Sequence, residues 1–177
     1  YIESGNTTKD TGIIKSLENI LENVDVPRTL AKSGMQIVID QEKEIYLDIL
    51  YPDREVSNVE SNDSSIITKL VYENICFIMS GDASQKIERY IANIEKNNLD
   101  CDVLKVGHHG SRTSTSEEWV GFISPDYAVI SAGKNNTYGH PHKEVLQTLE
   151  KFGVNVLRVD EKGRVEISSD GNNIFIK

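Results

Sequence analysis

The spacing of apolar residues changes along the chain, and each change predicts an element. Near the start, apolar residues recur three or four positions apart, as in an amphipathic helix; they are Ile13, Ile14, Leu17, Ile20 and Leu21. Pro27 ends any continuation of this helix, which we place at residues 11–24. Two strand pairs follow, formed by residues 36–40 with 45–50 and by residues 65–72 with 75–79, the second pair turning at Glu73-Asn74.

In the second half of the chain, strand patterns alternate with helical ones. Strands are predicted at 102–106, 127–131, 154–159, 164–167 and 172–177, and helices at 84–96, 116–123 and 143–152. The strand at 75–79, ICFIM, is apolar throughout, so we expect it to be buried on both faces. This alternation predicts a single α/β (α+β layered) domain over residues 1–177, with helices packed on a largely buried sheet.

Composition agrees with an ordinary soluble domain, with 38% hydrophobic and 27% charged residues among 177. No apolar run approaches the roughly 18 residues that span a bilayer, and the first residues do not form a secretory signal. The chain starts without Met, so we expect it to be a fragment or a processed piece.

The net charge of −9 makes the chain a poor candidate for a protein that coats nucleic acid non-specifically, because that mode depends on Lys and Arg neutralising phosphates. It leaves open a nuclease whose bound cations supply the positive charge. Cys76 and Cys101 lie in apolar, strand-like runs, and we expect two small buried hydrophobic residues rather than a disulfide or a metal pair.

Candidate chemistry gathers after three predicted strands. Asp82 follows the strand at 75–79, His108 and His109 follow the next strand, and His140 and His142 lie in the loop after 127–131. In α/β layers, ligands gather at the carboxyl ends of strands. A carboxylate with several imidazoles suits Zn, Mn or Fe.

Each of these residues also has a simpler interpretation. On position alone, Asp82 fits the N-cap of the helix that follows, and His140 fits a helix-entry residue with Pro141 at the first helical position. His142 would then be a surface residue in the first helical turn. If His108 and His109 alternate as on a strand, one ligates a metal while the other contacts substrate or orients the first.

Two polar segments lie beside these candidates. Residues 62–65 form a turn, since all four favour local hydrogen bonds to the backbone. Residues 111–116 either bind phosphate through hydroxyls, Arg112 and backbone N–H groups, or form a solvated loop that ends in an N-cap followed by acidic residues. The chain has no G-x-S-x-G elbow and no glycine-rich phosphate loop.

Four segments together carry a family resemblance. SNDSSIITKLVYENICFIMSGDA, DVLKVGHHGSRTSTSEEW, PDYAVISAGKNNTYGHPHKEVLQTL and RVDEKGRVEI resemble the C-terminal metallo-β-lactamase-like domain of ComEC-type DNA-uptake competence proteins and their stand-alone relatives. The resemblance covers residues 50–167, and residues 1–49 match only loosely, as a linker. It implies part of an αββα sandwich with a hydrolytic site for one or two Zn or Mn ions.

The resemblance also assigns roles to residues. Asp82 matches the aspartate that bridges two metals, and His108 looks like a ligand of the second metal, with His109 as a close competitor. His109 and His140 are implied catalytic residues that donate to the scissile phosphate or the leaving oxygen. Asn62 stands where many enzymes of this fold place a histidine, and we expect substrate contacts from Asn62, Ser64 and Ser111.

One departure from the family weakens these assignments. The signature H-x-H-x-D-H is nowhere in the chain, and we expect it to lie N-terminal to Tyr1. A catalytic zinc needs three protein ligands, so this chain alone should bind metal poorly and hydrolyse little. The sheet should also be incomplete, or its edge covered by a partner.

The resemblance implies a metal-dependent phosphodiesterase or nuclease that acts on DNA, or on another phosphodiester, during uptake. It further implies a membrane channel domain in the same parent protein and an extracytoplasmic or membrane-associated location. The alternative is an inactive scaffold or DNA-contacting domain. Hydrolysis of β-lactams or thioesters ranks last, because it shares the fold but not the G-H-H-G-S and Y-G-H-P loops.

Overall fold

A seven-stranded mixed sheet organises the molecule, which we describe from a computed structural model for residues 1–6 and 12–177. The strand order is β3-β4-β5-β6-β7-β8-β9. The strands are β3 (Gln36–Asp40), β4 (Ile45–Tyr51), β5 (Ile67–Tyr72), β6 (Ile75–Met79), β7 (Val103–Lys105), β8 (Tyr127–Ile130) and β9 (Asn155–Arg158). The α/β-layered prediction is confirmed.

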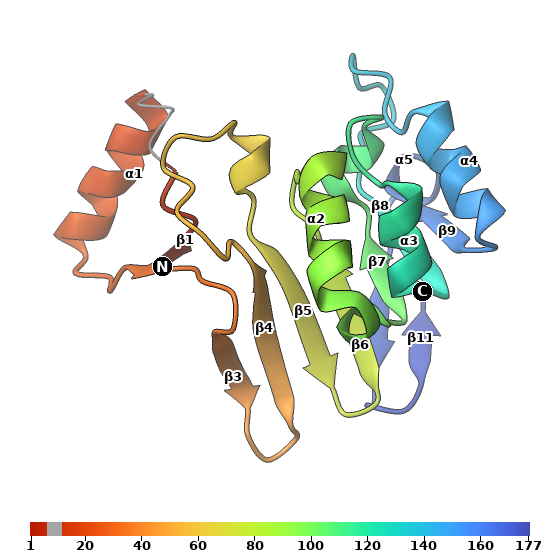
Figure 1. The fold of residues 1–177 in the computed structure, drawn as a ribbon, viewed down its shortest axis with the longest axis horizontal. Helices are drawn as coiled ribbons and strands as arrows, with labels where there is room; N and C mark the ends of the chain where they lie inside the picture. The colour runs from red at the N-terminus through yellow and green to blue at the C-terminus, as the bar shows by residue number, and fades with distance from the viewer. Residues whose placement is uncertain (7–11) are drawn as a thin grey trace.

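The sheet has an antiparallel half and a parallel half. Strands β3 to β6 pair antiparallel, and the predicted hairpin is confirmed, with Tyr72 opposite Ile75. Strands β6 to β9 pair parallel. Parallel neighbours need crossover connections, and these contain the three predicted helices, α2 (Gln85–Glu95), α3 (Glu117–Ile123) and α4 (Lys143–Lys151) (Figure 1).

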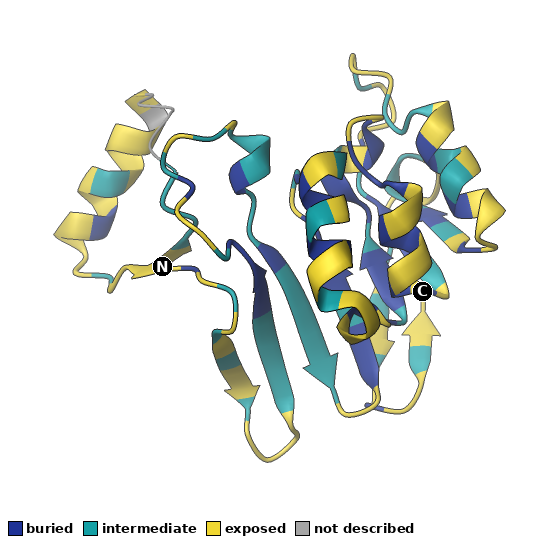
Figure 2. Cartoon of the chain, in the orientation of Figure 1, coloured by how far each residue is buried: buried dark blue, intermediate teal, exposed yellow. Residues whose placement is uncertain are grey.

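The hydrophobic core lies between these helices and one face of the sheet (Figure 2). Ile78, Leu104 and Ile130 fill it from three neighbouring strands, and Trp119 and Leu149 fill it from α3 and α4; all five are fully buried. Alternate residues of a strand point to opposite faces, so the other face of the sheet is built from a different set.

That second face is apolar but only partly covered. Leu47, Leu70 and Phe77 lie opposite one another on β4, β5 and β6, and all three are half-buried. Met79 is half-buried too. The expectation that ICFIM is buried on both faces is therefore wrong, because the helices cover only the face that carries Cys76 and Ile78.

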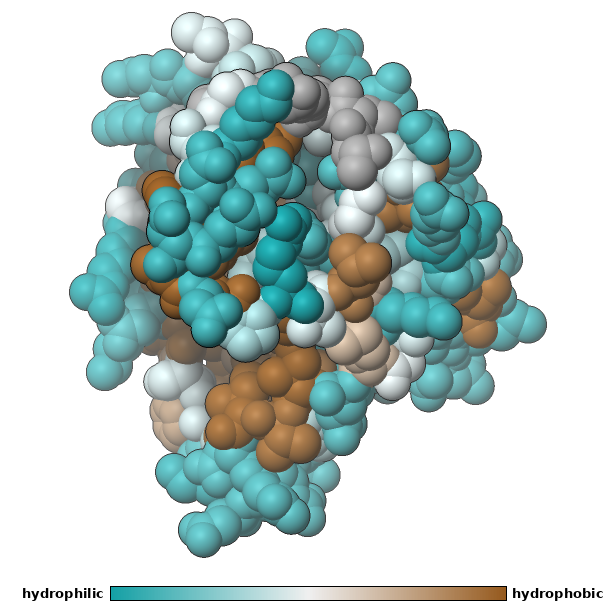
Figure 3. Space-filling model, turned by 90° about the vertical axis from the view of Figure 1, so that its left-hand side faces the viewer, coloured by the Kyte–Doolittle hydropathy of each residue, from teal (hydrophilic) through white to brown (hydrophobic). Residues whose placement is uncertain are grey.

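The N-terminal elements stand apart from the main sheet (Figure 1). They are the paired strands β1 (Ile2–Glu3) and β2 (Thr29–Leu30) and the predicted helix α1 (Gly12–Asn23), whose expected first residue, Thr11, lies outside the described residues. Apolar side chains gather on this side of the molecule (Figure 3); exposed ones include Ile20, Val24, Leu30, Val38 and Ile39. Within the described ranges, no helix has the length and apolar character needed to cross a bilayer.

The C-terminal segment differs from prediction in its boundaries. A short helix, α5 (Val159–Lys162), follows β9 directly, and the strand expected at 164–167 begins only at Ile167. Strands β10 (Ile167–Ser169) and β11 (Ile174–Ile176) form a separate antiparallel hairpin. Asn74 N–H donates to the Gly171 carbonyl at 3.0 Å, which attaches this hairpin to the turn between β5 and β6.

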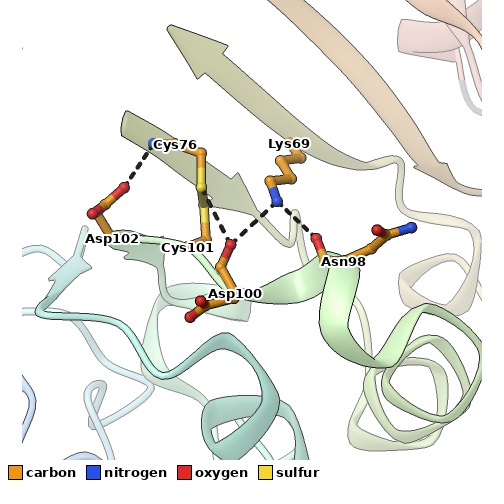
Figure 4. Close-up of a disulfide and its surroundings, with 6 residues drawn as sticks. All are labelled: Lys69, Cys76, Asn98, Asp100, Cys101 and Asp102. Carbon is orange, nitrogen blue, oxygen red and sulfur yellow. Dashed lines mark hydrogen bonds between the residues drawn. A yellow bond between two sulfur atoms is a disulfide. The ribbon is translucent and has the colours of Figure 1, made fainter. Parts of the chain in front are cut away.

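Cys76 and Cys101 form a disulfide, which corrects the sequence interpretation (Figure 4). Both residues are buried, as expected, but they lie on neighbouring chain segments with their Cα atoms 5.2 Å apart. That separation is typical of a disulfide. The bond joins the start of β6 to the residues before β7, where Asp102 Oδ2 also accepts the Cys76 N–H at 2.8 Å.

Candidate functional site

Three successive strand ends meet at one edge of the sheet. Because β6, β7 and β8 are parallel, the segments that follow them emerge on the same side. Asp82 follows β6, the turn η3 (Gly107–Gly110) follows β7, and the loop with His140 follows β8. The predicted gathering of Asp82 and the histidines at one edge is confirmed.

Asp82 is not the N-cap of α2. Ser84 occupies that position and the helix begins at Gln85, so capping does not explain the aspartate. The Asp82 carboxylate is about half exposed, at 46% of its side-chain surface, and its Oδ1 lies 4.0 Å from His109 Nε2. The turn is held from behind, since Asp82 N–H donates to Ser65 Oγ at 3.1 Å. The carboxylate therefore faces the histidines.

His108 and His109 both have left-handed backbone conformations, with φ of 47° and 57°. Such angles are uncommon outside glycine. The argument from strand alternation is therefore wrong, because the pair lies in a tight turn. The two rings nevertheless separate, with centroids 6.4 Å apart and planes at 64°.

The two imidazoles have different partners. His109 Nδ1 lies 2.7 Å from the Ser131 carbonyl oxygen, which can only accept, so Nδ1 carries the proton and Nε2 faces Asp82. His108 Nδ1 lies 3.3 Å from Thr113 Oγ1 and 3.5 Å from Asn62 Nδ2. The chain thus presents one imidazole beside the aspartate and the other beside Asn62.

His140 lies between His108 and His142. Its ring centroid is 5.8 Å from that of His108 and 4.9 Å from that of His142. Burial, and after it the neighbouring imidazoles, lowers the pKa of His140, which favours the neutral form of the ring. A neutral imidazole can bind a metal or accept a proton.

The helix after this loop begins at the residue that the apolar spacing predicted. Helix α4 starts at Lys143, so Pro141 is not its first residue and His142 takes the N-cap position instead of the first turn. His142 Nδ1 accepts the Arg112 N–H at 3.3 Å, and His142 N–H donates to the Gly110 carbonyl at 2.9 Å. His142 therefore joins the loop after β7 to the loop after β8.

Residues 62–65 form a turn, as predicted, and Asn62–Ser64 is a single 3₁₀ turn, η1. Tyr51 Oη donates to the Asp63 carbonyl at 2.9 Å, and Ser84 Oγ donates to the Asp63 carboxylate. The Ser64 side chain is buried and donates to the Ser61 carbonyl at 2.6 Å. Of the expected substrate residues here, Asn62 reaches the histidines while Ser64 supports the turn.

The loop at 111–116 is mostly buried, contrary to the solvated interpretation. Ser114 Oγ donates to the carbonyls of Gly107 and Ser111, at 2.8 and 2.9 Å. Ser111 Oγ lies 3.0 Å from Thr113 Oγ1. The N-cap part of that interpretation is confirmed, because Ser116 Oγ accepts the Trp119 N–H at 3.3 Å. These hydroxyls shape the loop beneath His108.

Sequence reasoning missed Glu88, a fully buried carboxylate behind the site. It accepts the N–H groups of Thr115 and Ser116, each at 2.7 Å. Burial raises the pKa of Glu88 to about 7, against the lowering effect of these two bonds. A signal was present, because helical spacing places Glu88 on the same buried face of α2 as Ile91 and Ala92.

Lys105 was also missed. It ends β7, three residues before His108, and burial lowers the pKa of its ammonium group while Asp82 acts in the opposite direction. Its Nζ donates to the Val106 carbonyl at 2.8 Å. The half-buried Lys105 therefore places a positive charge at this edge of an otherwise acidic chain.

The donors present do not make a complete metal site. Carboxylate and imidazole suit Zn or Mn, but across residues 1–6 and 12–177 no three His, Cys, Asp or Glu side chains converge to hold an ion. A catalytic zinc requires three protein ligands. As arranged here, the edge fits part of a metal centre and not a whole one.

No protein-family model matches the chain. Over 126 residues it is 39% identical to ComE operon protein 3 of Bacillus subtilis, and this match covers 71% of the chain and 16% of that protein. It is 34% identical over 112 residues to competence protein ComA of Neisseria gonorrhoeae, covering 63% of this chain and 16% of that protein. It is 33% identical over 124 residues to recombination protein 2 of Haemophilus influenzae, covering 70% of this chain and 15% of that protein. The matched region is less than a fifth of each relative, and the chain is homologous to one segment of these competence proteins.

Proposed function

We propose that the chain is the C-terminal portion of a metallo-β-lactamase-fold hydrolase domain that cleaves phosphodiester bonds of DNA during uptake. The observation that carries this proposal is the gathering of Asp82, His108, His109 and His140 at one sheet edge. It occurs in a chain that shares over a third of its matched residues with ComE operon protein 3. In the whole protein, Asp82 and His108 are part of a Zn or Mn site whose other ligands come from residues outside this chain.

His109 and His140 are the residues proposed to act on the substrate. The Ser131 carbonyl fixes the proton of His109 on Nδ1, and burial and the neighbouring imidazoles lower the pKa of His140. Asn62, whose Nδ2 lies 3.5 Å from His108 Nδ1, is a further proposed substrate contact. Oriented groups of this kind stabilise developing charge on a phosphate without reorganising.

The uncovered face of the sheet supports a sandwich that this chain does not complete. Helices cover one face, whereas Leu47, Leu70 and Phe77 form a half-buried apolar row on the other. Apolar sheet faces are stabilised by a second packed layer. We assign that layer to a sheet from the remainder of a longer protein, as the greater length of the relatives supports.

The disulfide supports an extracytoplasmic location. Disulfides persist in oxidising compartments and are rare in the cytosol, and Cys76 and Cys101 are joined here. We therefore place the domain outside the cytoplasm, beside a membrane channel domain of the same parent protein. This is where a strand of incoming DNA would be degraded.

The alternative function is a scaffold or DNA-contacting domain without catalysis. One observation favours it, namely that the described residues bring no three potential metal ligands together. The two functions differ in whether the whole protein retains metal at Asp82, and this difference can be measured directly.

The test is metal content, measured by mass spectrometry, for the 177-residue chain and for the complete product of its gene. We expect the complete product to retain one or two equivalents of Zn or Mn and to cleave single-stranded DNA. Asp82→Asn should lose both properties. The matched control is Asp126→Asn, because Asp126 is exposed just before β8, at the opposite edge of the sheet. Absence of metal from every form would overturn the hydrolase proposal in favour of the scaffold.

A further inference from the structure

Tyr138 is the most exposed large hydrophobic residue of the described chain, at 77% of its surface. It is not part of the core, yet its ring is ordered against a neighbour. The Tyr138 and His140 rings stack with centroids 5.7 Å apart and planes at 23°. A stacked pair with one face left open to solvent offers a flat aromatic surface beside the histidine site.

A pocket of about 450 Å³ lies next to this pair. Its lining includes His109, Ser131, Asn136, Tyr138 and His140. The lining is largely apolar, with Tyr138 on one side. Because His109 and His140 belong both to this pocket and to the proposed site, a molecule in the pocket would contact two residues of that site.

The loop that carries the aromatic pair is fixed in place. Asn136 Nδ2 donates to the carbonyls of Gly133 and His140, at 2.8 and 2.7 Å, and Asn136 Oδ1 accepts the His140 N–H at 2.9 Å. These three bonds close the loop from Gly133 to His140 and hold it before any ligand arrives. A surface that is already ordered loses less entropy when it binds.

We propose that Tyr138 and this pocket bind a nucleobase of the substrate strand, next to the phosphate that is cleaved. The proposal rests on the proposed function, since it assumes that the phosphodiester is a nucleic acid. A base stacks on an aromatic ring whatever its sequence, which suits an enzyme that degrades arbitrary DNA. Stacking also provides affinity that a chain of net charge −9 cannot obtain from phosphate neutralisation alone.

The test measures binding without cleavage, in the presence of a chelator. Fluorescence anisotropy of the full 177-residue chain compares a short single-stranded oligothymidylate with an abasic strand of equal length and charge. We expect the strand with bases to bind at least about fivefold more tightly, the ratio that one stacked base provides. Tyr138→Ala should abolish this preference and Tyr138→Phe should keep it. Phe175→Ala, which removes an exposed aromatic ring from β11, is the matched control and should leave it unchanged.

The outcomes separate this inference from the proposed function. An unchanged preference in Tyr138→Ala, or no preference in the unsubstituted chain, overturns the base-binding site even if the complete protein cleaves DNA through Asp82. A preference that depends on Tyr138 supports the site even if no form retains metal, and only the hydrolase proposal then fails.

Discussion

The carboxylate of Glu88 lies 2.7 Å from the backbone nitrogen of Thr115, inside the core and behind the histidines. The same carboxylate accepts the Ser116 N–H, so α2 holds the loop that leads into α3. A Cβ atom added to Gly107, the first residue of the histidine turn, would lie 3.4 Å from Glu88 Oε1. The turn that presents His108 therefore rests directly on a buried acid.

Stability should fall as pH rises because of Glu88. The folded-state pKa of Glu88 is raised from 4.5 to about 7, so the folded state binds this proton more tightly than the unfolded state. Its contribution is fully present below about pH 4.5 and is lost as pH rises through about 7. The difference between the unfolded-state and folded-state pKa values of Glu88 corresponds to on the order of 3 kcal/mol in the free energy of unfolding. Urea unfolding at pH 5 and at pH 8 measures it.

Glu88→Gln removes the titrating group and should flatten this pH dependence. It should also lower the free energy of unfolding at pH 5 by about 1–3 kcal/mol, since an amide cannot accept both backbone N–H groups. A glutamine variant that keeps the full pH dependence would show that another group is responsible.

Reduction of the disulfide should destabilise the chain. Cys76 and Cys101 are 25 residues apart in sequence, and closing a loop of this size typically adds about 2–4 kcal/mol to the free energy of unfolding. Guanidinium unfolding with and without reductant measures the difference. The Cys76→Ala/Cys101→Ala double variant should match the reduced form and show no response to reductant; an equal response in both proteins would contradict the pairing.

Gly110→Ala should disrupt the site more than Gly139→Ala. Both glycines have positive φ, 82° and 74°, so alanine costs about 1–2 kcal/mol at either position. At Gly110 the new Cβ would also lie 2.6 Å from Pro141 Cβ, whereas at Gly139 nothing lies within 4 Å. Overpacking should add about 1–3 kcal/mol at Gly110 alone. Thermal unfolding of the two variants tests the difference, and equal melting temperatures would argue against the contact.

Asn136→Ala should loosen the loop that carries Tyr138 and His140 without unfolding the domain. Three hydrogen bonds are lost, but the loop is largely exposed and its opening is local. Hydrogen exchange of the His140 amide should accelerate while exchange in β6 and β7 stays unchanged. Asn136→Asp should accelerate it less, because a carboxylate can still accept from His140; faster exchange throughout the sheet would mean that the loop supports the whole fold.

The sequence located Asp82 and the histidines because strand order alone brings them together. Asp82, His108 and the His140 loop each follow one of three neighbouring parallel strands. The carboxyl ends of such strands lie at the same edge of the sheet, regardless of the conformation of the loops. The strand and helix assignments behind this inference came from the spacing of apolar residues, and the structure confirms these strands and helices. The least accurate assignments were at the C-terminus, where α5 follows β9 directly and no loop separates the two elements.

Features that depend on loop conformation or on spatial neighbours were not predicted. The pairing of Cys76 with Cys101 requires β6 and β7 to be adjacent, which no local pattern states. The positive φ angles of His108 and His109 follow from the turn between two glycines, so alternation along a strand was the wrong template. The Tyr138–His140 stack lies on a loop that the hydrogen bonds of Asn136 close, and no local pattern in the sequence indicates those bonds.

The backbone bond from His108 N–H to the Gly81 carbonyl, 3.0 Å long, joins the turn of Asp82 to the turn of the histidines. Neither partner in this bond is a side chain, so exchanging Asp82 or His108 for another residue leaves it in place. The spacing of the two turns is thus set by backbone atoms, and the donor groups that they carry can be exchanged one at a time.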